Sequence, residues 1–123
     1  MAAQQKLIPD PQGDERDALV RRWFELTREQ LPAAAPSRDW PVRFDHCFQR
    51  ILLDNACKGR WTDTIERPAY AHAPDTILRA AIAKGERVLA DEADLWALDA
   101  NSLLWRGKPL KGKARMRAGA ANG

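Results

Sequence analysis

The stretch RFDHCFQRILLDNACKGRW, residues 43–61, decides which fold this sequence predicts. Wound as a helix at about 100° per residue, it places most of its apolar side chains in one broad arc. The members of that arc are Phe44, Cys47, Phe48, Ile51 and Leu52. We therefore predict an amphipathic helix over residues 41–58 that contributes this arc to a core, with Pro41 in its first turn and Gly59 as its left-handed stop.

Helical periodicity also extends through most of the remaining chain. Apolar residues recur at helical intervals over residues 14–31, 75–89 and 92–105, which predicts three more helices. Residues 32–41 contain three prolines and separate the first two helices, because proline interrupts the helical hydrogen-bond ladder. No segment alternates apolar and polar residues for long enough to predict a strand. The predicted fold class is all-α, a small bundle of about four helices.

The 123 residues are enough for one domain with one modest core. We predict a flexible lead over residues 1–13, which carry two prolines and a glycine, and a helical domain over residues 14–105. Residues 106–123 have little to bury, which predicts a disordered basic tail. Neither a secretory signal nor an apolar run near the ~20 residues of a membrane crossing is visible. We therefore expect a cytoplasmic protein with reduced thiols and no membrane contact.

The net charge of +3 conceals an uneven distribution. All 17 acidic residues and 14 of the 20 basic ones lie in residues 1–105, so this part carries a net charge of −3. The predicted tail carries the remaining six basic residues and no acid. Such a cluster of cations is typical of an electrostatic contact with a polyanion.

The opening stretch also places an acid, a histidine and a cysteine side by side. His46 and Cys47 are consecutive on the predicted helix and point about 100° apart, so they cannot form a nucleophile and base pair. Cys57 lies near the negative end of the helix dipole, which raises the pKa of a thiol. The chain lacks the close Cys or His pairs of a structural zinc site. We predict no catalytic residue, metal or cofactor; an enzyme centred on His46, His72 and Tyr70 stays open if these converge in one pocket.

Asn55 falls inside the apolar arc of the predicted helix over residues 41–58. A buried amide is costly unless it is hydrogen-bonded, so we predict that it ties a neighbouring loop or helix end. The opposite face carries Arg43, His46 and Arg50. Asp54 is placed to pair with Arg50 one turn away, and this face is polar and mostly basic.

The motifs FDHCFQRILLDNACKGRW, RPAYAHAP and NSLLWRGK carry a resemblance to known proteins. Over roughly residues 40–108 the chain resembles a group of short bacterial proteins that are labelled as related to GNAT-type N-acetyltransferases. The resemblance implies a mixed sheet, acetyl-CoA and a pyrophosphate loop with Gly followed two positions later by Gly or Ala. The nearest run, Lys84-Gly85-Glu86, lies inside a predicted helix and lacks the second small residue. No catalytic residue is therefore carried over.

We predict a small non-enzymatic helical protein that associates with the phosphate backbone of DNA or RNA, without reading base sequence. The predicted nucleic-acid-binding residues are Arg43, His46, Arg50, Lys58, Arg60, Arg106, Lys108, Lys111, Lys113, Arg115 and Arg117. Among five tryptophans, Trp61 is the best candidate for stacking on a base. The competing interpretation is that all five supply the burial that a small domain needs.

Two other functions stay open. In the first, the protein is an interaction module for another protein and has no nucleic-acid role. It would use apolar residues left over from the core, such as Leu53, Trp96 and Leu103. In the second, it is an acetyl-CoA-dependent N-acetyltransferase-related protein, as the resemblance implies. Protection by acetyl-CoA against thermal unfolding separates this function from the others.

Overall fold

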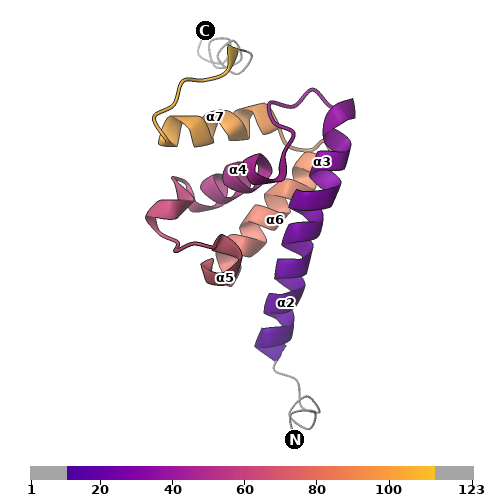
Figure 1. Ribbon diagram of the computed structural model, residues 1–123, viewed down its shortest axis with the longest axis vertical. Helices are drawn as coiled ribbons and strands as arrows, with labels where there is room; N and C mark the ends of the chain where they lie inside the picture. Colours follow the sequence, from indigo (N-terminus) through magenta and orange to yellow (C-terminus); the bar gives the residue numbers. More distant parts are fainter. Residues whose placement is uncertain (1–10, 113–123) are drawn as a thin grey trace, which may run out of the picture.

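The computed structural model describes residues 11–112, which form helices joined by loops (Figure 1). The longer helices are α2 (Pro11–Phe24), α4 (Asp45–Cys57), α6 (Asp75–Leu89) and α7 (Leu95–Trp105). The shorter elements are the π-helix η1 (Glu25–Gln30), α3 (Leu31–Ala34), α5 (Ala69–His72) and the 3-10 turns η2 (Ala35–Ser37) and η3 (Trp61–Asp63). Residues 11–112 contain no strand, so the predicted all-α class is confirmed. None of their helices is long and apolar enough to span a membrane.

The first helix is longer at both ends than the sequence predicts. It begins at Pro11, inside the predicted flexible lead, and α2, η1, α3 and η2 follow one another without a loop as far as Ser37. Pro32, the predicted end of this helix, lies early in α3. The cause is the π-helix, in which the N–H of Leu31 donates to the carbonyl of Leu26, five residues back rather than four. The wider turn changes the hydrogen-bond register just before Pro32. The helix can therefore continue through Pro32, although this residue has no N–H to donate.

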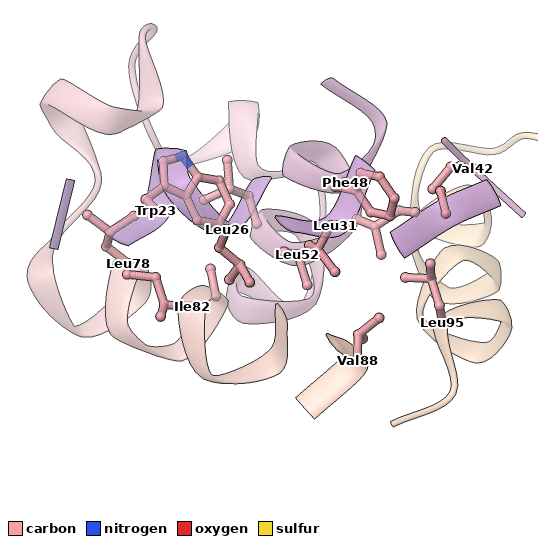
Figure 2. Packing of buried hydrophobic residues seen from close by; sticks show 14 residues of the cluster. Trp23, Leu26, Leu31, Val42, Phe48, Leu52, Leu78, Ile82, Val88 and Leu95 are labelled. Carbon is pink, nitrogen blue, oxygen red and sulfur yellow. The ribbon is translucent and has the colours of Figure 1, made fainter. Parts of the chain in front are cut away.

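The core of the domain surrounds α4, which packs against α6, α7 and η1. Figure 2 shows Phe48 and Leu52 of α4 together with Leu26 of η1, Leu78 of α6 and Leu95 of α7. All five are buried. The predicted amphipathic helix is therefore the element on which the other helices assemble.

The predicted apolar arc is confirmed in its middle and wrong at its start. Phe48, Ile51 and Leu52 are fully buried, and Cys47 is partly buried against the core. Phe44, in contrast, is 64% exposed. The reason is that α4 begins only at Asp45, and Phe44 has an extended backbone as the residue before the helix. Its side chain therefore does not follow the helical arc.

The ends of α4 and α7 also differ from the predicted ones. Lys58 has the left-handed backbone (φ 57°) that was predicted for Gly59. The N–H of Gly59 instead donates to the carbonyl of Asp54 at 3.1 Å, which closes the six-to-one hydrogen bond of a Schellman cap. α7 begins after Asp94, because the Asp94 carboxylate accepts the N–H of Trp96 at 3.0 Å and caps the helix there.

Candidate anion-binding cleft

A cleft of about 510 Å³ opens beside α4, between the junction of α2 with η1 and the segment that joins α4 to α6. Its lining combines cationic side chains with aromatic rings. The residues of these kinds are Trp23, Phe24, Arg28, His46, Arg50, Trp61, Arg67, Tyr70 and Arg106. None of the described residues that line it is an aspartate or a glutamate. The cleft therefore brings four guanidinium groups together without a carboxylate on its walls.

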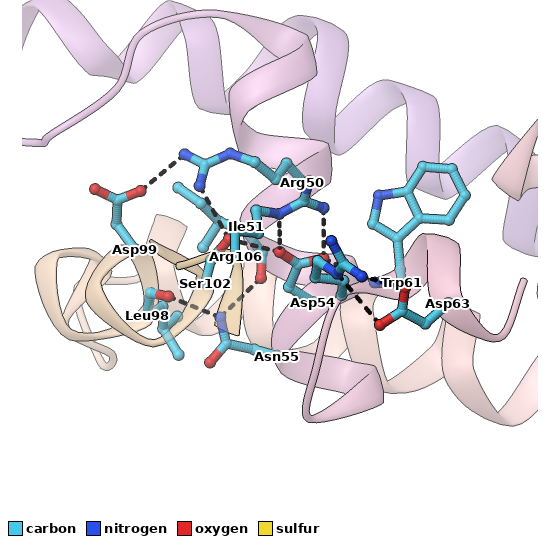
Figure 3. Close-up of polar contacts among 11 residues, drawn as sticks. Arg50, Ile51, Asp54, Asn55, Trp61, Asp63, Leu98, Asp99, Ser102 and Arg106 are labelled. Atoms are coloured by element: carbon cyan, nitrogen blue, oxygen red, sulfur yellow. Dashed lines mark hydrogen bonds and ion pairs between the residues drawn. The ribbon is translucent and has the colours of Figure 1, made fainter. Parts of the chain in front are cut away.

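Behind the cleft, the fully buried carboxylate of Asp54 fixes Arg106 (Figure 3). Arg106 donates from Nε to Oδ2 at 2.6 Å and from Nη2 to Oδ1 at 2.9 Å. The carboxylate also accepts the hydroxyl of Ser102 at 2.6 Å and the backbone N–H of Trp61 at 3.0 Å. The hydrogen bond to Asp54 raises the pKa of Arg106, against partial burial, which lowers it. Asp54 thus joins α4, α7 and η3 and holds one guanidinium in place.

A second fully buried carboxylate, Asp99 of α7, fixes Arg50 of α4 (Figure 3). Arg50 donates from Nη2 to Asp99 Oδ1 at 2.8 Å and from Nη1 to the hydroxyl of Ser102 at 2.9 Å. The predicted pairing of Arg50 with Asp54 along α4 is therefore wrong. Because α7 packs on this face of α4, Arg50 reaches a buried acid across the helix interface rather than the acid one turn away.

Asn55 makes the tie that its position in the apolar arc predicts (Figure 3). Its Nδ2 donates to the carbonyls of Ile51 and Leu98, each at 2.8 Å. Its Oδ1 accepts from Nδ2 of Asn101 at 3.0 Å. These bonds fasten α7 to α4 and confirm the structural role predicted for this amide.

Arg28 and Arg67 differ from the two fixed arginines because they lie over aromatic rings. The guanidinium carbon of Arg28 is 3.8 Å from the centroid of the Phe24 ring, and that of Arg67 is 5.8 Å from the Trp61 ring. Both side chains are exposed, and neither forms an ion pair with any residue in the range 11–112. Their charges are therefore available to an anion.

Sequence reasoning missed both of these arginines. Arg28 follows Phe24 by one helical turn, a spacing at which a cation and a ring meet. That spacing was a usable signal. Arg67 stands in a loop, and nothing in its neighbourhood indicates that it faces the cleft. Its position becomes visible only when η3 and α5 are placed against α4.

The predicted nucleic-acid-binding residues are only partly brought together. Those that line the cleft are His46, Arg50 and Arg106. Those that are exposed outside it are Arg43, Lys58, Arg60 and Lys108. Those that lie outside the described residues are Lys113, Arg115 and Arg117. The remaining described member, Lys111, is half-buried and pairs with Asp99. The described members thus form one cluster at the cleft and several scattered charges, of which Arg60 pairs with Asp63.

The first part of the predicted tail is folded against the domain. Gly107 has a left-handed backbone (φ 67°), and the chain turns after α7. Lys111 then places Nζ 2.9 Å from Oδ2 of the buried Asp99, while Arg106 binds Asp54. The prediction that the tail cations have no neutralising acid is wrong for these two. Their acids belong to α4 and α7 rather than to the tail, and Asp54 is 52 residues from Arg106 in sequence, so a count of charges within the tail does not find them.

The residues of the catalytic alternative do not all meet. His46 and Tyr70 line the cleft, but His72 does not. The exposed ring of His46 stacks on Phe44, with centroids 6.0 Å apart and planes at 2°. Within residues 11–112, no group of three or more His, Cys, Asp or Glu side chains is arranged to hold a metal ion.

Cys57 is a free thiol close to the polar network. Burial raises its pKa, a hydrogen bond with Thr64 lowers it, and the charge of Asp54 raises it further. The predicted direction is confirmed, but burial is the main cause rather than the helix dipole. A raised pKa keeps the thiol protonated and makes it a poor nucleophile.

A second cleft, of about 440 Å³, has the opposite charge. Its acidic and tryptophan lining residues are Asp39, Trp40, Asp91, Glu92, Asp94 and Trp96. Two of these residues stabilise the local fold. Asp94 caps α7, and Trp96 donates from Nε1 to the carbonyl of Asp39 at 2.7 Å. This cleft is thus formed by the start of a helix and the loop tied to it.

Comparisons of the chain with protein-family models, curated proteins and solved structures gave no match. The mixed sheet that the resemblance to GNAT-type acetyltransferases implies is absent from residues 11–112. We therefore infer function from the geometry and charge of the arginine-lined cleft.

Proposed function

We propose that this is a small non-enzymatic helical protein that binds the phosphates of nucleic acid without reading base sequence. The observation that supports the proposal is the cleft, with four arginines and no carboxylate among its described lining residues. Guanidinium groups bind phosphate through paired, charge-assisted hydrogen bonds. A concave site lined by one sign of charge also concentrates the opposite charge.

The four arginines have different roles in such a contact. Arg50 and Arg106 each pair with a buried aspartate, so they are held in place and bring little net charge. Arg28 and Arg67 have no such partner among residues 11–112 and bring their full charge. Asp99 also pairs with Lys111, so the four arginines, Lys111 and the two buried acids together leave a net charge of +3. Two of these positive charges are those of Arg28 and Arg67 in the cleft. The fixed pair shapes the site, and the other pair attracts the anion.

The remaining polar groups of the cleft are poorly suited to reading bases. Gln49 carries the kind of amide that recognises adenine, but its Nε2 donates to the hydroxyl of Thr27 at 3.0 Å. Contacts between guanidinium groups and phosphates carry no sequence information. Binding should therefore depend on charge and ionic strength more than on base sequence.

Fluorescence anisotropy with labelled duplex DNA and single-stranded RNA tests the proposal at two salt concentrations. The full chain should bind both, with an affinity that falls steeply as salt rises. The variant Arg28→Gln/Arg67→Gln should bind about tenfold more weakly, and its salt slope should fall by about two because two phosphate contacts are lost.

The matched control is Arg21→Gln/Arg87→Gln, which removes the same charge from exposed positions of α2 and α6 outside the cleft. It should retain most of the affinity. The proposal fails if the full chain does not bind at low salt. It also fails if the control loses as much affinity as the cleft variant.

The three tail cations outside the described residues can be tested in the full chain. The variant Lys113→Gln/Arg115→Gln/Arg117→Gln should weaken binding and lower the salt slope without abolishing binding. Loss of all binding in this variant, with wild-type binding in the cleft variant, would assign the contact to the tail alone.

One observation favours a second candidate function, a protein–protein contact, which can be tested first with a second copy of this chain. α7 exposes Leu104 and Trp105, which are 62% and 38% exposed. Leu53 and Leu103, which the sequence predicted for such a contact, are buried and therefore not available to a partner. Sedimentation velocity of the full chain and of Leu104→Ser would detect self-association through this face, which the substitution should abolish.

A further inference from the structure

We infer that the arginine-lined cleft accepts an unpaired nucleobase together with its phosphate, so that single strands and free nucleoside monophosphates are its preferred ligands. This inference rests on the proposed function and adds stacking to the phosphate contacts. It concerns the aromatic walls of the cleft, which phosphate binding alone leaves without a role.

Tyr70 and Trp61 supply aromatic surfaces that are held in position. Tyr70 is 44% exposed, and its ring meets Phe24 edge-on with centroids 5.3 Å apart. Trp61 is partly buried against the core, and its backbone N–H is fixed by Asp54 at 3.0 Å. Every base has a π face, so a fixed aromatic ring stacks on any of them. Because the rings are already ordered, little conformational entropy is lost on binding.

The phosphate-binding groups lie beside these rings. Arg67 is over the Trp61 ring at 5.8 Å from its centroid, and Arg28 is over the Phe24 ring against which Tyr70 packs. A base that stacks on one of the exposed rings therefore has its own phosphate near an arginine without an acidic partner in the range 11–112. This pairing of a ring with an adjacent cation matches a nucleotide better than it matches bare phosphate.

The size of the cleft also favours one nucleotide over a duplex. Its volume of about 510 Å³ falls within the range of roughly 300–1,000 Å³ that small-ligand sites occupy. In a duplex the bases are stacked on one another, and extruding one costs a few kcal/mol. A duplex can therefore use the arginines but not the rings, whereas a single strand can use both.

Isothermal titration calorimetry with adenosine 5′-monophosphate, adenosine and inorganic phosphate tests whether base and phosphate act together. The monophosphate should bind about tenfold more tightly than either part. Anisotropy should likewise show a dT 12-mer binding about tenfold more tightly than a 12-base-pair duplex at the same salt. Tyr70→Leu should remove most of this difference while leaving duplex binding unchanged.

Trp61→Leu should have the same effect, and Tyr70→Leu keeps the test valid if Trp61→Leu does not fold. Trp105→Leu is the control, since Trp105 is a partly exposed tryptophan outside the cleft. It should leave the preference for single strands intact. Thermal unfolding by circular dichroism verifies that each variant is folded.

The outcomes distinguish this inference from the proposed function. If single strand and duplex bind with equal, salt-dependent affinity, the inference of base stacking is wrong, but the proposed function of phosphate binding is still supported. Binding of inorganic phosphate as tight as that of the monophosphate would lead to the same conclusion. If no nucleic acid binds at low salt, both fall together.

Discussion

The two clefts are similar in size and both contain tryptophan, but their charges are placed in different ways. In the acidic cleft the carboxylates are on the walls, and Asp94 caps the start of α7. In the arginine-lined cleft the carboxylates of Asp54 and Asp99 are buried behind the walls, and guanidinium groups face the space. A capping acid is explained by the helix that it begins. A cluster of four arginines, two held by buried acids and two lying over aromatic rings, has no such explanation, which is why we assign function to that cleft.

The largest difference between the two clefts should be in what their acids contribute to stability. Asp54→Asn leaves Arg106 without its charged partner, and we expect it to lower the free energy of unfolding by about 3 kcal/mol. Glu92→Gln, an exposed acid of the other cleft, should change it by less than about 0.5 kcal/mol. Urea unfolding of both variants measures this. Similar shifts of the two midpoints would show that the buried network is not a special feature of the arginine-lined cleft.

A smaller difference should separate the tryptophans of the two clefts. Trp96→Phe removes the hydrogen bond from Nε1 to Asp39, which should cost about 0.5 kcal/mol of stability because the site is solvated. It should leave affinity for single strands unchanged, since the surrounding acids repel phosphate. The same anisotropy titration that follows Trp61→Leu measures this. A loss of affinity comparable to that of Trp61→Leu would remove the functional distinction between the clefts.

The smallest effect concerns the thiol of Cys57 near the buried network. Its pKa is raised chiefly by burial, so the thiolate forms only at higher pH than in the unfolded chain. In a Cys47→Ser background, the rate of alkylation by iodoacetamide should rise with pH about a higher midpoint for the folded chain than for the urea-unfolded one. A folded midpoint at or below the unfolded one would contradict this environment for Cys57.

The sequence was sufficient for features that depend on one helix at a time. The burial of Phe48, Ile51 and Leu52 follows from helical periodicity, and so does the buried position of Asn55. The start of α6 at Asp75 also agrees with the prediction. The first helix was predicted too short because a π-helix carries it past Pro32, and a single residue pattern does not distinguish i→i+5 from i→i+4 hydrogen bonds.

The cleft could not be predicted because its parts come from segments far apart in the chain. Arg106 and Asp54 are 52 residues apart in sequence, and Arg50 and Asp99 are 49 apart. Periodicity shows that Arg50 lies on a polar face, but not that α7 covers this face. Because of that, Arg50 was predicted to pair with Asp54 instead of Asp99, and Arg106 was predicted as a tail cation without an acid. Only the spacing of Arg28 and Phe24 offered a local signal.

The most direct test of phosphate binding at the arginine-lined cleft is an NMR titration of the full, ¹⁵N-labelled chain with a dT 12-mer. It follows the Nε–H signals of the arginines and the indole signals of the tryptophans. We predict that the signals of Arg28, Arg67 and Trp61 shift in a saturable way, while that of Trp96 in the acidic cleft does not. Shifts confined to residues 113–123, or equal shifts of Trp61 and Trp96, would contradict the assignment of this cleft as the nucleic-acid contact.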